Sequence, residues 1–432
     1  MEYHAALAWL DRHVDLERTR DPGRLRTPTL DRMRELMDVM AEPQRQYPVI
    51  HLTGTNGKTS TARIVTRLLD VAGLTVGTYT SPHLQKITER MTSNLEPISE
   101  GAFGEVIGAV ANLLPLLEAP PTYFELLTAA AFRWFADVAV HAAVVEVGLL
   151  GEWDATNVVD GQVAVVTNVG PDHLDYASTI ENVAKEKAGI VKPGATSVLV
   201  LGETDPALTA PFLAAGAGAV WQRDEEFACT SNEIAHKGRL VSLRTPAARY
   251  RDVFLSLHGA YQADNAAIAV AAVEAFLGEP LGGDVVEEAF ATATSPGRVE
   301  VVGHQPLVVL DGAHNPPGAA ALADTLVQEF GDDAPWTVVL GLLTPHDPAD
   351  VLAALDDLRV GAVVACAPAG TPRAVAADEV AAAAEDAGFG AAVERSVAAA
   401  CTTAVGHAGP DGRVLVTGSL YTVGEARTAL VR

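Results

Sequence analysis

The stretch HLTGTNGKTSTARIVTRLL, residues 51–69, decides the fold, because it joins an apolar run to a helical pattern through a glycine-rich loop. Gly54 and Gly57 allow the backbone to fold back so that its amide N–H groups converge on one point. Lys58 adds a positive charge there, and the helix that follows directs its dipole at the same point. The stretch predicts a loop for the β- and γ-phosphates of a nucleotide. Its spacing departs from the common phosphate loop, because Leu52 stands where that loop has glycine.

Short apolar runs alternate with helical patterns on both sides of this loop. The runs predicted to be buried strands lie at residues 47–54, 74–80, 141–148, 163–170 and 196–202. The helices predicted between them lie at residues 60–73, 122–137 and 179–191. This alternation predicts an α/β fold with a doubly wound, mostly parallel sheet, in which ligands bind beyond the carboxyl ends of the strands.

A second block of the same alternation follows the stretch TSPGRVEVV. Its predicted strands lie at residues 306–315, 336–343, 361–368 and 412–421. Proline and glycine near Ser295–Gly297 break the preceding helix, which places a domain boundary there. We therefore predict a P-loop-type nucleotide-binding domain of residues 1–296 and a smaller, Rossmann-like α/β domain of residues 297–432.

The composition limits the classes of function. A chain of 432 residues is too long for one ordinary core, and its formal net charge of −25 argues against nucleic acid or an anionic membrane as a partner. Any anionic substrate must therefore meet a local cluster of cations or helix N-termini. No apolar run approaches the ~20 residues of a membrane span, and the charged N-terminal segment resembles an amphipathic helix rather than a signal peptide. We expect a soluble cytoplasmic protein whose cysteines are reduced, small core residues: Cys229, Cys366 and Cys401.

Polar residues follow several predicted strands at the edge where ligands bind. Glu146 ends one strand among apolar neighbours, where a carboxylate is costly unless it is paired or binds a cation. Asp172, His173 and Asp175 follow the next strand. On what we expect to be adjacent strands, Glu146 and His173 can share Mg²⁺ with nucleotide phosphates, and Ser81 can add a hydroxyl ligand. The alternatives are an ion pair for Glu146, a helix cap for His173 and a turn for Ser81.

Two further clusters combine charged residues with glycine. In AKEKAGI, Lys185 and Lys187 lie on a predicted helix, and an exposed charged face is the preferred interpretation for Lys185. In LDGAHNPPG, Asp311 ends a predicted strand, and His314 and Asn315 begin a helix. Because Asp is favoured as a helix cap, capping explains Asp311 as well as a functional role does.

The chain contains eight recognisable motifs in this order: GTNGKTS, YTSPHL, GPDHLDY, EKAGI, YQADNAA, PGRVE, DGAHN and VTGSLY. Together they resemble the folylpolyglutamate synthase and dihydrofolate synthase family, which belongs to the Mur ligase superfamily. The resemblance runs from about residue 5 to the C-terminus. The family's shortened loop, Gly-Thr-Asn-Gly-Lys, explains the departure at Leu52.

The resemblance implies an ATP-dependent amide ligase. In this chemistry a carboxylate attacks the γ-phosphate of ATP to give an acyl phosphate, and the amino group of L-glutamate then displaces phosphate. The acid is dihydropteroate, a reduced folate, or both. The implied cofactors are ATP and Mg²⁺ at two sites, with K⁺ or another monovalent cation as a further candidate. We expect a monomer that binds only small-molecule partners.

The resemblance also assigns roles to individual residues. Lys58, Lys187 and His314 match catalytic positions, and Lys187 matches a lysine that is carbamylated in the family. The implied metal ligands are Ser81, Glu146, His173 and Lys187. The implied nucleotide-binding residues are Gly54, Thr55, Asn56, Gly57, Lys58, Thr59, Ser60, Asn265, Arg298 and Asp311. The implied substrate-binding residues are Phe124, Asp154 and His83.

Two segments depart from the family pattern. In GLLGEWDATN, Leu150 replaces a glycine and Glu152 replaces an arginine; in TPHDP, Pro345 and His346 replace Asp-Lys. Because the first change reverses a charge, it can alter which acid is accepted. Three alternatives stay open: a paralogue that joins an amino acid to another acid, a P-loop small-molecule kinase, and a nucleotide-binding regulator that has lost catalysis.

Overall fold

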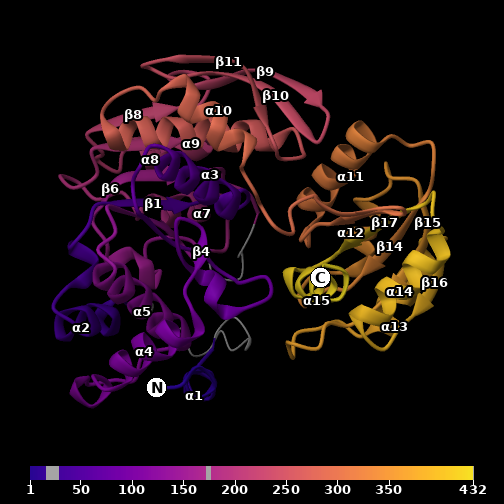
Figure 1. The fold of residues 1–432 in the computed structure, drawn as a ribbon, viewed down its shortest axis with the longest axis horizontal. Coiled ribbons are helices and arrows are strands. Elements are labelled where there is room, and N and C mark those ends of the chain that lie inside the picture. The colour runs from indigo at the N-terminus through magenta and orange to yellow at the C-terminus, as the bar shows by residue number, and fades with distance from the viewer. Residues whose placement is uncertain (16–28, 172–176, 432) are drawn as a thin grey trace.

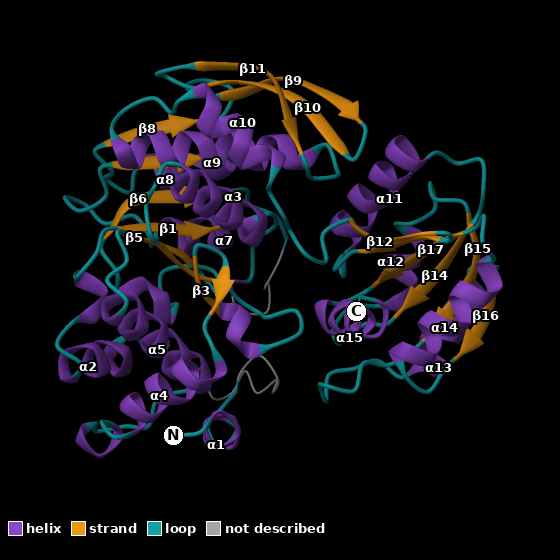
Figure 2. Cartoon of the chain, in the orientation of Figure 1, coloured by secondary structure: helices purple, strands orange, loops and turns teal. Residues whose placement is uncertain are grey.

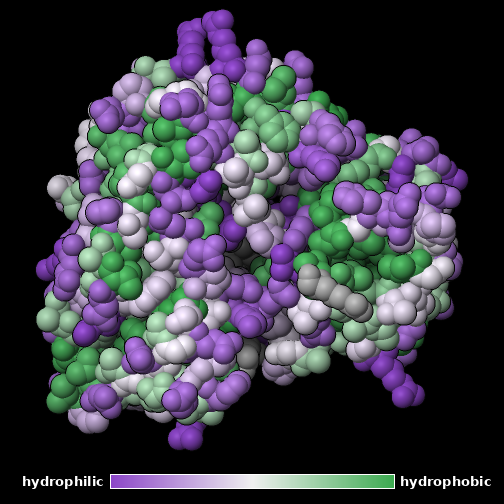
Figure 3. Space-filling model, viewed as in Figure 1, coloured by the Kyte–Doolittle hydropathy of each residue, from purple (hydrophilic) through white to green (hydrophobic). Residues whose placement is uncertain are grey.

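The computed structural model describes residues 1–15, 29–171 and 177–431. Two α/β domains lie side by side and are joined by a linker that runs from the end of α10 to the start of β12 (Figure 1). The predicted boundary at residues 296 and 297 falls within this linker. In the space-filling view, a hollow marks the junction of the two domains, and hydrophilic side chains cover much of the visible face (Figure 3).

The first domain is built on an eight-stranded sheet with the order β4-β3-β2-β5-β1-β6-β7-β8. Six of its strands are parallel, and β3 and β4 pair antiparallel at one edge. The predicted doubly wound, mostly parallel sheet is therefore confirmed. The strands are β1 (Val49–Thr53), β2 (Val76–Tyr79), β3 (Met91–Ser93), β4 (Glu96–Pro97), β5 (Ala142–Glu146), β6 (Gly161–Val166), β7 (Val198–Leu201) and β8 (Ala219–Gln222).

Helices cover both faces of this sheet, as Figure 2 shows. Successive residues of β1 point to opposite faces, so Ile50 packs into the core under α3 and α9, whereas Val49 packs into the core under α2, α4 and α5. The described helices of this domain are α1 (Tyr3–Leu10), α2 (Asp31–Val39), α3 (Lys58–Val71), α4 (Glu100–Ala111), α5 (Tyr123–Asp137), α7 (Ile180–Ala188), α8 (Pro206–Leu213), α9 (Tyr261–Leu277) and α10 (Gly283–Ala291).

A second, three-stranded antiparallel sheet lies over α9 and α10. It consists of β9 (Ala228–Ala235), β10 (Gly238–Arg244) and β11 (Arg249–Leu255), and no strand was predicted there. The residues of α9 are buried almost throughout, because the large sheet, α3 and this small sheet surround the helix. A helix that is apolar on all sides is stable only in such a position.

The second domain contains a six-stranded sheet with the order β12-β13-β17-β14-β15-β16, in which only β12 is antiparallel. Its strands are β12 (Glu300–His304), β13 (Leu307–Leu310), β14 (Trp336–Leu340), β15 (Val360–Ala365), β16 (Gly390–Val393) and β17 (Arg413–Thr417). Its helices are α11 (Pro316–Phe330), α12 (Pro348–Ala353), α13 (Ala377–Asp386), α14 (Val397–Ala408) and α15 (Leu420–Leu430). Separate apolar cores cover the two faces of the sheet, which confirms a second α/β unit.

Two further expectations concern thiols and membranes. Cys366 and Cys401 are buried and free, whereas Cys229 is free but only half-buried, so it is not the core residue that we expected. Within the described ranges, the structure has no helix that is both long enough and apolar enough to span a membrane.

Candidate functional site

The glycine-rich loop lies between β1 and α3 and depends on both of its glycines. Gly54 has φ +155°, and a Cβ there would lie 1.8 Å from Oγ1 of Thr167. Gly57 has φ +79°, and a Cβ there would lie 2.5 Å from Oδ1 of Asn265. Any larger residue would collide with Thr167, directly after β6, or with Asn265 of α9, so these close approaches explain the two glycines.

The segment after β6 holds the loop in shape. The backbone N–H of Asn56 donates to Oδ1 of Asn168 over 2.9 Å, and Oγ1 of Thr167 donates to the Asn56 carbonyl over 2.6 Å. The N–H of Gly170 donates to Oγ1 of Thr55 over 2.9 Å. The loop is therefore ordered by its neighbours, which lowers the entropic cost of binding an anion. The sequence signal for this support was the polar TNVG run at the end of the strand predicted at residues 163–170.

Two lysine side chains meet at the loop. Nζ of Lys58 donates to the carbonyls of Gly54 and Thr55 over 2.9 and 3.1 Å. Nζ of Lys187, which α7 positions in a fully buried setting, donates to the same Gly54 carbonyl over 2.8 Å. Lys185 is exposed, in agreement with its preferred interpretation. Positive charge is thus concentrated beside the loop of a strongly acidic chain.

A buried carboxylate faces this positive charge. Glu146 ends β5, and its two oxygens accept hydrogen bonds from Oγ1 of Thr59 over 2.9 and 3.1 Å. Burial raises the pKa of Glu146 to about 7, against the opposing effects of Lys58, Thr59, Arg298 and the backbone amide of Ser81. A carboxylate beside hydroxyl groups forms the oxygen-rich environment that Mg²⁺ prefers. The residues therefore fit a divalent cation.

One predicted arrangement was wrong. Glu146 and His173 were expected on adjacent strands, but β1 lies between β5 and β6 in the sheet. The chain places β5 and β6 on opposite sides of β1, so the phosphate loop separates their carboxyl ends. His173 itself lies outside the described residues. Among the residues that the structure does describe, no three His, Cys, Asp or Glu side chains gather in a metal-binding group.

Residues of the linker and the second domain approach the same region. The charge of Arg298 opposes the raised pKa of Glu146 in the first domain and of Asp311 in the second, where burial is again the main cause. Asp311 is buried and accepts hydrogen bonds from the N–H groups of Val299 and Ala313 over 2.9 and 2.7 Å. Arg298 therefore lies between the two predicted halves of the site.

Other predicted residues of this region make local contacts. Nδ1 of His314 lies 2.8 Å from the Gly312 carbonyl, and the His314 ring lies 5.2 Å from that of His346. Asn315 caps α11, so capping in this motif belongs to Asn315 rather than Asp311. Ser60 is buried, and its hydroxyl lies 2.9 Å from that of Ser295 in the linker.

The three predicted substrate residues lie on separate segments. The Phe124 ring packs 6.0 Å from that of Tyr79 and would lie 2.5 Å from a Cβ at Gly148. Asp154 is buried and accepts hydrogen bonds from the N–H groups of Leu149 and Thr156 over 2.8 and 3.0 Å. These bonds fold the GLLGEWDATN segment. Nδ1 of His83 lies 3.0 Å from Nε of Arg90.

The two departures in this segment have different structural outcomes. Leu150 adopts φ +56°, the left-handed conformation that favours the glycine found in the family, so the backbone turn is retained at a cost in strain. Glu152 lies next to α7: its N–H donates to the Glu186 carbonyl over 2.9 Å, and its charge adds to the burial that raises the pKa of Glu186. The reversed charge therefore acts on α7, the helix that carries Lys187.

Comparisons with known proteins match both domains. The family model for the Mur ligase middle domain matches residues 52–273, and that for the Mur ligase glutamate ligase domain matches residues 297–420. The chain is 39% identical over 445 residues to the dihydrofolate synthase/folylpolyglutamate synthase of Mycobacterium tuberculosis, covering 94% of this chain and 90% of the relative.

Solved structures of similar proteins cover the whole chain. The folylpolyglutamate synthase of M. tuberculosis, complexed with ADP and AMPPCP, superposes with a TM-score of 0.90 at 39% identity, over 100% of this chain and 99% of that one. A bifunctional folylpolyglutamate synthase/dihydrofolate synthase from Yersinia pestis, complexed with AMPPNP and an Mn ion, gives a TM-score of 0.85 at 28% identity, over 100% and 98% of the two chains.

Proposed function

The chain belongs to the folylpolyglutamate synthase and dihydrofolate synthase family of Mur ligases, and from this membership we propose how its residues carry out the reaction. It is an ATP-dependent ligase that adds L-glutamate to dihydropteroate or to reduced folates through an acyl phosphate. One observation supports the assignment of residues above all. The phosphate loop, the side chains of Lys58 and Lys187 and a buried carboxylate lie together at one edge of the sheet.

The phosphate loop is proposed to hold the β- and γ-phosphates of ATP. The amides of residues 57–60, at the N-terminus of α3, supply hydrogen bonds, and Lys58 supplies charge. Asn265 and Arg298 are proposed to complete the nucleotide site. Asn265 lies against Gly57 of the loop, and the charge of Arg298 acts on Glu146 of the first domain and on Asp311 of the second.

The enzyme binds a divalent cation together with ATP. We propose Glu146 and Ser81 as ligands, with Thr59 orienting the carboxylate, and we retain the prediction for His173. The cation would neutralise charge that develops on the phosphates. Because a carboxyl group must lose its proton to bind a metal, cation binding would lower the raised pKa of Glu146.

Lys187 is proposed to be carbamylated and to orient a second divalent cation. Its Nζ is buried beside the loop, where a second ammonium next to Lys58 would repel a metal ion and a carbamate would attract it. The predicted K⁺ or other monovalent cation stays a prediction, as do the monomeric state and the cytoplasmic location.

The pterin is proposed to lie near Phe124 and His83, which come from α5 and the loop after β2. The oxygens of Asp154 accept hydrogen bonds from its own segment, so its proposed role is to shape the pocket wall. From the second domain, His314 and Asp311 are proposed to meet the reacting groups when the domains close. His346 lies against His314 and takes the place of the family's lysine.

Turnover of defined substrates tests this function. The protein is incubated with ATP and Mg²⁺ and with dihydropteroate or tetrahydrofolate, with and without L-glutamate. Glutamate-dependent phosphate release, with a product heavier by one glutamyl unit, is the expected result. Phosphate attached to the product would instead indicate a kinase. Absence of turnover with either pteridine would favour the paralogue that uses another acid, for which the reversed charge at Glu152 is the supporting observation.

A further inference from the structure

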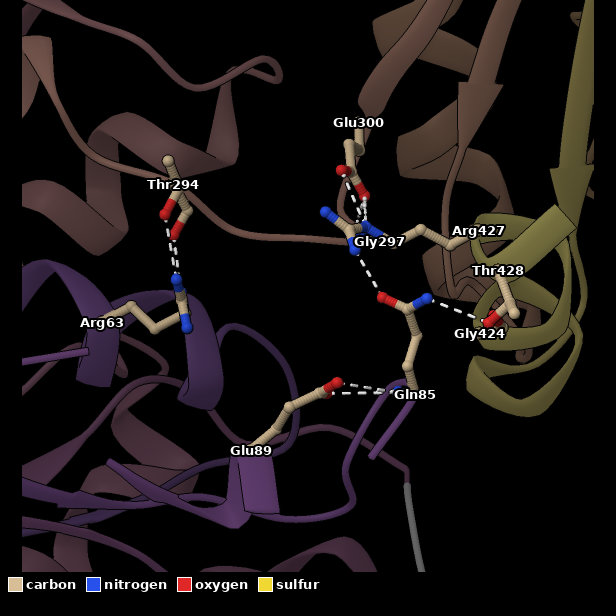
Figure 4. Close-up of polar contacts among 9 residues, drawn as sticks. All are labelled: Arg63, Gln85, Glu89, Thr294, Gly297, Glu300, Gly424, Arg427 and Thr428. Carbon is tan, nitrogen blue, oxygen red and sulfur yellow. Dashed lines mark hydrogen bonds and ion pairs between the residues drawn. The ribbon is translucent and has the colours of Figure 1, made fainter. Parts of the chain in front are cut away.

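A polar cluster outside the proposed reaction site connects three separate segments (Figure 4). Arg427 of α15 lies at its centre: Nε donates to the two oxygens of Glu300 over 3.0 and 3.1 Å, and Nη1 donates to Oε1 of Gln85. Nε2 of Gln85 in turn donates to Oγ1 of Thr428 over 2.9 Å. One guanidinium thus joins the second domain to a loop of the first domain and to the end of the linker.

On the linker side, Arg427 acts on the turn that carries Arg298. Oε2 of Glu300 accepts a hydrogen bond from the N–H of Gly297 over 2.8 Å, and Gly297 has φ +70°. The N–H of Arg298 donates back to the Ser295 carbonyl over 3.1 Å. Glu300 therefore closes a tight turn around Arg298, and Arg427 holds Glu300 in the orientation that closes it.

The other end of the linker is fixed to the helix that follows the phosphate loop. Nε of Arg63 on α3 donates to the Thr294 carbonyl over 2.7 Å, and Nη2 donates to the Thr294 hydroxyl over 2.9 Å (Figure 4). Burial lowers the pKa of Arg63, while Glu89 and Glu300 oppose that effect and Arg427 adds to it. These four charged groups therefore lie within electrostatic reach of one another.

On the loop side, Gln85 is presented by a rigid turn. The carboxylate of Glu89 accepts hydrogen bonds from three successive N–H groups, those of Leu84 at 2.9 Å, Gln85 at 3.2 Å and Lys86 at 2.9 Å. Ser81 and His83, a proposed metal ligand and a proposed substrate contact, lie just before this turn. A shift of Gln85 is therefore transmitted directly to them.

The three segments also pack too closely to move independently. A Cβ at Gly424 of α15 would lie 1.9 Å from the Leu84 carbonyl oxygen. A Cβ at Gly297 would lie 3.1 Å from Cγ1 of Val423 and 3.3 Å from the Leu84 side chain. Steric contact and hydrogen bonds thus join the loop, the linker turn and α15 as one unit.

We propose that Arg427 is a positioning residue that couples the turn of Arg298 to the loop of Ser81 and His83. Through it, the orientation of α15, and hence of the second domain, is linked to both the nucleotide side and the substrate side of the cleft. This inference rests on the proposed function, which assigns Arg298 to the nucleotide and His83 to the substrate.

Three variants separate the two arms of the coupling: the loop arm is the contact of Arg427 with Gln85, and the linker arm is the contact of Arg427 with Glu300. In Gln85→Ala only the loop arm is lost, so KM for the folate should rise while the Kd for ATP, measured in EDTA so that Ser81 binds no cation, stays unchanged. In Glu300→Ala the linker arm is lost, so the Kd for ATP should rise. In Arg427→Gln both constants should rise, and kcat/KM should fall by up to about a hundredfold, the loss that a misplacement of reacting groups by about 1 Å can cause. Arg427→Lys retains the positive charge but not the planar guanidinium that donates to Glu300 and Gln85 together, so its kcat/KM should lie between those of Arg427→Gln and the wild type.

The matched control is Glu425→Gln on the same helix, because Glu425 binds only backbone N–H groups of the second domain, those of Ala369 and Gly370, in the contacts that the structure describes. Thermal melting of every variant establishes that it is folded. ATP binding, measured by calorimetry, reports on the linker arm even if the wild-type protein turns over no folate, so failure of the assigned function and failure of the coupling are distinguishable. The proposal is overturned if Arg427→Gln matches Glu425→Gln in ATP Kd, folate KM and kcat.

Discussion

Besides the cluster around Arg427, a second contact joins the two domains: Glu329, near the end of α11, binds Arg239 and Gly259 of the first domain. Replacing Glu329 by alanine is expected to weaken this contact. The Glu329 side chain is 3% exposed and accepts hydrogen bonds from Nη1 of Arg239 over 2.7 Å and from the N–H of Gly259 over 2.8 Å. Nδ1 of His258 lies 2.6 Å from its other oxygen. Burial acts to raise the pKa of Glu329, but these hydrogen bonds outweigh burial and lower it, so the ionised form is the one that binds.

The magnitude follows from what alanine leaves behind. The Arg239 side chain is 5% exposed, so loss of Glu329 leaves a buried guanidinium without its carboxylate partner, although Oδ1 of Asn232 still accepts a hydrogen bond from Nε. Breaking a buried ion pair in this way typically costs about 3–5 kcal/mol. If the chain of 432 residues unfolds as one unit, an unfolding entropy of about 2.1 cal/mol/K per residue converts this cost to a Tm lowered by about 3–6 °C. Glu329→Gln keeps an acceptor for Arg239 and should cost less.

Differential scanning calorimetry measures these shifts. Asp324→Ala is the control, because Asp324 lies on the same helix with its side chain exposed. A double replacement, Arg239→Met with Glu329→Leu, should recover stability, since it removes the unpaired charge together with its partner. If Glu329→Ala melts within 1 °C of both the wild type and the control, the buried ion pair does not hold the domains together and the reasoning is refuted.

Three other outcomes are expected. Gly424→Ala should lower Tm despite the better helix propensity of alanine, because its Cβ would meet the Leu84 carbonyl oxygen at 1.9 Å. The control Gly406→Ala, with open space around it, should instead stabilise α14 by about 0.5–1 kcal/mol. Equal shifts in Tm for the two variants would contradict the packing argument. Lys187→Ala should be nearly inactive and partly rescued by short carboxylates, whereas full activity would exclude the carbamate. Since folding raises the pKa of Glu146 from 4.5 to about 7, the folded state binds its proton more tightly. In EDTA, the contribution of Glu146 to stability should therefore fall by on the order of 3 kcal/mol as pH rises from 4.5 to above 7, and the fall in stability of Glu146→Gln over this range should be smaller than that of the wild type by this amount.

The parts of the fold that could be predicted are those in which burial dictates the pattern. Strand β1 and strand β5 are buried throughout and mostly apolar because helices cover both faces, and each ends in a polar residue where the sheet meets the ligand edge. The small sheet of β9–β11 was missed because one face is exposed, so its apolar residues are interrupted by charged ones. The hairpin between β9 and β10 did leave a signal in the sequence, which is the pair Lys237-Gly238 at its turn. In the structure Lys237 adopts the left-handed conformation, with φ +63°.

The functional site also has a part that could be predicted from the sequence and a part that could not. The phosphate loop is contiguous in sequence, so Gly54, Gly57 and Lys58 could be predicted to lie together from a glycine-rich stretch between an apolar run and a helical pattern. Strand order is not encoded locally, which is why the adjacency expected for Glu146 and His173 was wrong. The contact between Gln85 and Arg427 spans 342 positions and uses residue types that are common on surfaces, so no local pattern could predict it.

The burial of α9 has a consequence for synthesis of the protein on the ribosome. This helix packs against α3, which ends at Val71, and the same core also includes residues of α10, which ends at Ala291. At about 5–20 residues per second, the ribosome needs roughly 10–45 s to add the intervening chain. Until then, α9 does not cover the apolar surface of α3 or its face of β6 and β7. We expect the nascent first domain to bind chaperones throughout this interval and to be released only after α10 has emerged.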